Sequence, residues 1–273
     1  MNVLESKAVK GFITMADDGW NQGWHERNGG NLSYRMSDAD VNEVISELDH
    51  STPFYPIGAS VPGVAGEYFI FTGTGRYFQN VIKNPTESIG IIKLDDKGEN
   101  YQIVWGLENG GRPTSEIPSH LMSHETKKAV SGGKHRVIYH AHPVNTIALT
   151  FVLPLKDEIF TREIWEMMPE CSVVFPEGIG VAEWLVPGSR ELAIRTGELL
   201  KSYNVAIWPH HGMLCSGEDF DSTFGLMHTV EKAASILVKV MSMSSTKLQT
   251  ITSDNMRALA KDFKLSLDEK FLY

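Results

Sequence analysis

Two histidines separated by one residue are the first candidates for chemistry in this chain. His140 and His142 close the stretch RVIYHAH, residues 136–142, in which Val137 and Ile138 favour a β-strand. Side chains two positions apart on a strand point to the same face of the sheet, so the two imidazoles should lie side by side. Such a pair suits two of the four positions around a tetrahedral zinc ion.

A third imidazole is available in the sequence WPHHG, residues 208–212, which follows a strand-like run at 205–207. Either His210 or His211 could supply it, and the spacing alone does not decide between them. Three histidines leave one coordination position open, which is typical of a catalytic rather than a structural zinc site. The alternative is that these are unrelated core or surface histidines.

A carboxylate near this metal could serve as a general acid or base. Glu116 lies in PTSEIPSH, residues 113–120, where a helix is expected to begin. The simpler interpretation of Glu116 is a first-turn glutamate that interacts favourably with the helix dipole. Its position in the sequence leaves both possibilities open.

Three segments rich in small residues could bind an anion through exposed backbone N–H groups. They are NGGN at 28–31, TGTGR at 72–76, and Thr114-Ser115 ahead of the expected helix. Each could equally be a plain turn. The chain has neither of the glycine-rich nucleotide motifs GxxxxGK[ST] and GxGxxG. Together with the histidines, the three segments favour a small phosphorylated substrate over a nucleotide.

The hydrophobic pattern places these residues within an alternation of strands and helices. It predicts a layered α/β sandwich with a central, mainly antiparallel sheet flanked by helices, and one domain spanning 1–273 with an irregular excursion at about 38–66. Strands are expected at 32–36, 68–72, 89–94, 101–107, 136–142, 171–175 and 205–208. Helices are expected at 3–24, from Asp38, after Glu116, and at 144–153, 156–168, 189–203 and 220–243.

Charge and composition narrow the class of protein. The net charge of −9 over 273 residues, without a concentrated basic segment, argues against nucleic acid or an anionic membrane as a partner. We expect no signal peptide and no membrane span, because the first residues and every longer window lack a sufficient apolar run. Two cysteines without CxxC spacing, Cys171 and Cys215, fit a reducing cytoplasm.

The order Gly-Gly-Asn, Thr-Gly-x-Gly, Thr-Ser-Glu, His-x-His and Pro-x-His-Gly, between residues 28 and 212, resembles the class II aldolase/adducin family. The resemblance implies one zinc ion per subunit, held by His140, His142 and His211, because the histidine of the family directly precedes a glycine. It implies that Glu116 is the acid/base carboxyl group. The phosphate-binding positions that it implies are Asn28, Gly30, Asn31, Thr74, Gly75, Thr114 and Ser115.

The resemblance is strongest to the branch that cleaves L-rhamnulose 1-phosphate in rhamnose catabolism, with dihydroxyacetone phosphate and L-lactaldehyde as products. It further implies a homotetramer with sites near subunit interfaces, where Glu170 would handle the hydroxyl on the aldehyde side. Alternatives are cleavage of L-fuculose 1-phosphate, a sugar-phosphate 4-epimerase, and a non-catalytic adducin-like module. Epimerases of the family tend to carry aspartate where Glu116 stands, and a binding module has no need of the histidines.

Overall fold

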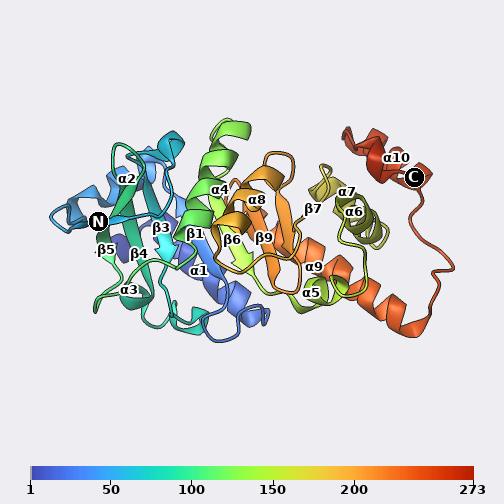
Figure 1. The fold of residues 1–273 in the computed structure, drawn as a ribbon, viewed down its shortest axis with the longest axis horizontal. Helices are drawn as coiled ribbons and strands as arrows, with labels where there is room; N and C mark the ends of the chain where they lie inside the picture. The colour runs from blue at the N-terminus through green and yellow to red at the C-terminus, as the bar shows by residue number, and fades with distance from the viewer. Residues whose placement is uncertain (1) are drawn as a thin grey trace.

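A nine-stranded sheet forms the centre of the protein in this computed structural model, which describes residues 2–273 (Figure 1). The strand order is β2-β5-β4-β3-β1-β6-β9-β8-β7, and all neighbours are antiparallel except β7 and β8. The strands are β1 Asn31–Arg35, β2 Phe54–Pro56, β3 Tyr68–Thr72, β4 Ile89–Leu94, β5 Asn100–Gly106, β6 Val137–Ala141, β7 Gly180–Val181, β8 Val205–Trp208 and β9 Gly212–Gly217. The predicted fold class is therefore confirmed.

Helices cover both faces of the sheet. In Figure 1, α4 and α8 lie in front of it and contact each other, whereas α1 lies behind it and contacts α9. The helices are α1 Lys7–Asn21, α2 Asp38–Val44, α3 Pro85–Ser88, α4 Ile117–Val130, α5 Val144–Leu149, α6 Asp157–Trp165, α7 Pro169–Val174, α8 Arg190–Leu199, α9 Phe220–Met243 and α10 Ser253–Phe263. None of the helices within residues 2–273 is both long and apolar enough to cross a membrane.

The segment 38–66 contains α2, β2 and two short 3-10 helices at Ile45–Glu47 and Pro62–Val64. Its apolar side chains Ile57, Val61 and Val64 are buried in a cluster that also includes Phe69 of β3 and Leu121 of α4. The burial of this apolar surface stabilises the contact between α4 and the sheet. This matters for the site, because Glu116 immediately precedes α4.

The strand expected at 171–175 is wrong, because this segment is the helix α7. The β-branched pair Val173 and Val174 favoured a strand in the sequence. In the structure, the adjacent residues Cys171 and Ser172 are both buried together with Phe175, while Val174 is exposed. Burial at i, i+1 and i+4 marks one face of a helix, whereas adjacent residues of a strand point to opposite faces. Pro169 at the start of the helix already has a backbone angle suited to a first turn. Tertiary packing has overridden the local strand preference.

Candidate metal centre and substrate pocket

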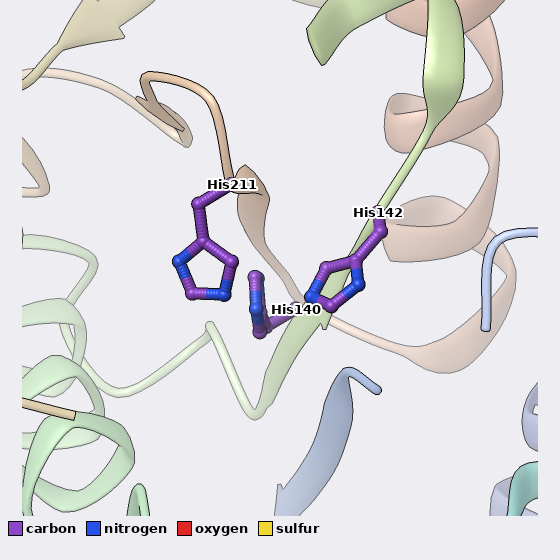
Figure 2. Close-up of side chains that lie close together, drawn as sticks. All are labelled: His140, His142 and His211. Atoms are coloured by element: carbon purple, nitrogen blue, oxygen red, sulfur yellow. The ribbon is translucent and has the colours of Figure 1, made fainter. Parts of the chain in front are cut away.

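Three histidines converge at the ends of the neighbouring strands β6, β9 and β8. His140 lies on β6 and His142 directly follows it, whereas His211 lies in the turn between β8 and β9. Their rings point toward one another (Figure 2), with ring centroids 4.8–5.1 Å apart. One potential ligand nitrogen from each residue lies within 4.8 Å of the others, a separation that one metal ion could bridge.

The hydrogen bonds of two of these rings leave a lone pair free for a metal. Nδ1 of His140 donates to the carbonyl oxygen of Met213 at 3.1 Å, and Nδ1 of His142 donates to the carboxylate of Glu26 at 2.8 Å. Within residues 2–273, the Nε2 atoms of both rings are buried without a partner. Unpartnered buried polar atoms are unfavourable unless a ligand satisfies them, so the residues fit a metal ion.

Burial also keeps two of the three rings, those of His140 and His211, uncharged. It holds the pKa of His140 well below the ordinary value, with further lowering by the neighbouring His211 and His142. Burial, with a smaller contribution from His142, lowers the pKa of His211 to about 4. A neutral imidazole is the form that binds a metal, so these two rings are ready to bind one at physiological pH.

The structure distinguishes the two candidates for the third imidazole. His211 lies in the cluster, whereas His210 has a left-handed backbone with φ of 60° and turns away from it. Nδ1 of His210 lies 3.1 Å from the hydroxyl of Thr150, and its ring packs on Phe151 at 4.1 Å. The turn between β8 and β9 thus directs two adjacent histidines to opposite surroundings.

A cavity of about 180 Å³ lies next to the histidines and gathers most of the residues expected at the site. Eleven residues that the sequence predicted for the site line this cavity, together with Gly29 and Gly73. The eleven are Asn28, Gly30, Asn31, Thr74, Gly75, Thr114, Ser115, Glu116, His140, His142 and His211. Glu170 is the exception: it lies exposed in the first turn of α7 and does not line this cavity.

No lysine or arginine within the described part of the chain lines the cavity. A phosphate bound there would rely on hydroxyl groups and backbone N–H groups, as the sequence suggested. Larger hollows exist elsewhere, such as one of about 750 Å³ beside α1, but its lining residues include no histidine. The chemistry of the donors, rather than volume, therefore identifies the candidate site.

The loop at 28–30 must approach the sheet closely. Gly30 has φ of 73°, and a Cβ atom there would lie 2.7 Å from the carbonyl oxygen of His140. His25 supports the loop: its Nδ1 lies 3.0 Å from the carbonyl oxygen of Gly29 and its Nε2 lies 2.7 Å from the Tyr139 hydroxyl. Only glycine fits at position 30 without moving these groups.

Glu116 is buried at the N-terminus of α4. Its Oε2 accepts a hydrogen bond of 2.9 Å from the side-chain amide of Asn31. Burial raises the pKa of Glu116 above the ordinary value of a glutamate, against the opposing effects of the Asn31 hydrogen bond and of nearby His142. A carboxyl group that retains its proton to a higher pH is suited to donate and accept one near neutrality.

Several residues that support the site were not singled out in the sequence. Glu26 holds His142, and Ser33, His120 and His124 lie behind Asn31. A signal existed for the latter group: a polar residue stands at every second position of β1, and two histidines lie four residues apart on α4. Such patterns usually mark a face exposed to solvent. The sequence does not show that the polar face of β1 and the histidine face of α4 are buried against each other.

A family model and individual relatives place the chain in the same family. The family model described as "Class II Aldolase and Adducin N-terminal domain" matches residues 11–238. A rhamnulose-1-phosphate aldolase of Mannheimia succiniciproducens is 46% identical over 262 residues, which cover 96% of each chain. The rhamnulose-1-phosphate aldolase of Escherichia coli strain K12 is 43% identical over 96% of this chain and 95% of its own length.

Solved structures show the same fold. A sugar-phosphate aldolase from Thermotoga maritima superposes with a TM-score of 0.75 at 27% identity, over 88% of this chain and 97% of its own. An L-fuculose 1-phosphate aldolase superposes with a TM-score of 0.61 at 18% identity, over 96% and 98% of the two chains. At the latter identity the likeness concerns the fold alone.

Proposed function

The chain belongs to the class II aldolase and adducin family as a lyase, and we propose that it cleaves L-rhamnulose 1-phosphate into dihydroxyacetone phosphate and L-lactaldehyde. The observation that carries this proposal is the single cavity that joins three histidines, a buried glutamate and three small-residue loops. The names of the relatives that share over 40% of the sequence along almost the whole chain supply the substrate.

The metal in this proposal is one zinc ion, held by His140, His142 and His211. An all-imidazole set of three ligands that leaves coordination space for substrate is a common catalytic arrangement for zinc. When bound, the ion would act as a Lewis acid that stabilises negative charge on the oxygen atoms of the substrate. Glu26 would fix the ring of His142 and its tautomer through the Nδ1 hydrogen bond.

The protein side chains then have separate tasks. The hydroxyls of Thr74, Thr114 and Ser115 and the glycine-rich loops would position the phosphate and with it the reacting carbons. Removal of the proton from the C4 hydroxyl lets the C3–C4 electron pair pass to C3 as C4 becomes the aldehyde carbonyl. The carboxyl group of Glu116 donates its proton to C3, which yields dihydroxyacetone phosphate.

Direct assay of substrate turnover tests this proposal. We expect the protein to release dihydroxyacetone phosphate, followed by coupled NADH oxidation, faster from L-rhamnulose 1-phosphate than from L-fuculose 1-phosphate. Chelation should abolish turnover and zinc should restore it, because in this proposal the ion held by the three histidines stabilises the charge that cleavage creates. Turnover of neither ester with zinc bound would contradict the aldolase assignment and favour epimerase chemistry.

Glu170 requires a separate proposal, because it lies outside the cavity of its own chain. We propose that the protein is a homotetramer in which Glu170 accepts the C4 hydroxyl proton at the site of a neighbouring subunit. Its exposed position in the first turn of α7 supports this.

Subunit mixing tests the role in a neighbouring site. Glu170→Gln and Glu116→Gln should each lower turnover, and co-expressed mixed oligomers should regain part of it, because some sites then combine two intact residues. Purification through a different tag on each variant isolates the mixed oligomers. Mixed oligomers no more active than the average of the two parents would contradict the proposal.

A further inference from the structure

A row of buried polar side chains runs from Glu116 into the interior between β1 and α4. Asn31 and Ser33 lie two residues apart on β1, and His120 and His124 lie four residues apart on α4. Two residues of a strand advance about 6.6–6.8 Å and four residues of a helix about 6.0 Å, so the two pairs match in spacing. All four side chains are at most 6% exposed.

Each member of the row contacts the next. Asn31 Nδ2 lies 2.9 Å from Glu116 Oε2, and Asn31 Oδ1 is bonded to His120 Nε2. Ser33 Oγ joins the two histidines, at 2.6 Å from Nδ1 of His120 and 2.8 Å from Nε2 of His124. Nδ1 of His124 is buried without a partner among the described residues, so the row ends there.

The chemistry of these groups allows one direction for the whole row. The amide oxygen of Asn31 only accepts, so Nε2 of His120 must donate to it. In a neutral ring Nδ1 then accepts, and the hydroxyl of Ser33 must donate to Nδ1 of His120. The oxygen of Ser33 in turn accepts from Nε2 of His124, which leaves Nδ1 of His124 without a proton. The reverse direction would place the proton of His124 on Nδ1, which is buried without an acceptor among the described residues, and an unsatisfied buried N–H is unfavourable.

We propose that His120 and His124, acting through Ser33, are positioning residues that hold the side-chain amide of Asn31 with its N–H toward Glu116. This inference rests on the proposed acid/base function of Glu116. In the reversed orientation of Asn31, its carbonyl oxygen would face the carboxylate of Glu116, and the two would repel each other in a buried setting. The row thus selects the orientation in which the carboxylate is bound and fixed.

Both histidines must be neutral for the row to work. Burial lowers the pKa of His120 to about 3 and holds the pKa of His124 well below its ordinary value. The groups that face them are the aromatic rings of Phe71 and Phe69, while Arg35 and Arg136 act on His124 in the same direction as burial. None of these groups carries a negative charge that would offset the cost of burying a charged imidazole.

The tautomers can be measured on the unmodified holoenzyme. Imidazole ¹⁵N chemical shifts of histidine-labelled protein, assigned by the loss of signals in His120→Gln and His124→Gln, should show both rings neutral and protonated at Nε2. A proton on Nδ1 of His120, or a charged ring near neutral pH, would overturn the proposal. This measurement does not depend on turnover, so it stands even if the proposed activity fails.

A matched pair of amides tests the consequence for catalysis. His120→Gln places an N–H near the position of Nε2 and can still donate to Asn31, whereas His120→Asn is one methylene shorter and reaches only toward Ser33. We expect His120→Asn to lower kcat on the order of 10–100-fold, with KM changed far less, and His120→Gln to recover most of that loss.

Metal content and melting temperature of the two variants should be similar, because both exchange the same ring for an amide. An equal loss of kcat in both, or a better kcat in His120→Asn, would overturn the positioning role. Should His120→Asn not fold, the tautomer measurement, which needs only His120→Gln and His124→Gln for its assignment, still decides the proposal.

Discussion

Glu116→Gln is expected to lower kcat by about 10²–10⁴-fold, because an amide cannot transfer the proton that the carboxyl group gives to C3. The amide oxygen of the new side chain can still accept the hydrogen bond from Asn31, so the fold should not change. Steady-state kinetics with L-rhamnulose 1-phosphate, alongside zinc analysis and thermal melting, measure the three properties separately.

The control for this variant lies on the same helix. Glu125 of α4 accepts a hydrogen bond of 2.6 Å from the backbone N–H of Gly63, and a glutamine can keep that bond. Glu125→Gln should therefore leave kcat and zinc content at the wild-type level. Near-normal turnover of Glu116→Gln would exclude Glu116 as the acid/base group, and parallel losses in both variants would point to a general effect on α4.

His211→Asn is expected to lose the metal and, with it, turnover. Loss of an outer-shell partner such as a hydrogen-bonded carboxylate weakens metal binding by about 10–100-fold, and loss of a ligand should exceed that. Elemental analysis after dialysis should give about one zinc per chain for the wild type, as expected for a mononuclear three-histidine site, and far less for the variant.

His210→Asn supplies the matched control, because it makes the same exchange at the adjacent position. Asparagine tolerates the left-handed backbone that residue 210 adopts, so the turn between β8 and β9 should keep its shape. Zinc content should therefore stay at the wild-type level in this variant. Retention of zinc by His211→Asn together with its loss from His210→Asn would assign the ligand to His210 and contradict the geometry.

Local periodicity explains which elements the sequence predicted well. The strands Tyr68–Thr72 and Val205–Trp208 and the long helix Phe220–Met243 were predicted with the bounds that the structure has. Each has an uninterrupted pattern of its own, set by neighbours along the chain. The segment around Val173 and Val174 was predicted wrongly because its secondary structure depends on which of its side chains other helices bury.

Some features of the candidate site were also predictable from local sequence, whereas others were not. The pairing of His140 with His142 and the three small-residue loops follow from residue type and local spacing, and the structure gathers them around one cavity. The choice between His210 and His211 required the turn between β8 and β9, where the left-handed residue rotates one ring away from the other. The sequence alone contains the ring types but not that rotation.

The support for Glu116 was decided only by tertiary structure. Asn31 pairs across strands with His140, which places the same residue beside the histidine cluster and beside Glu116. The sequence determined the layered α/β class and most of the residue types that the chemistry needs. The tertiary structure decided which of them meet, because strand register and the packing of α4 on β1 depend on contacts between segments far apart in the chain, which no local pattern encodes.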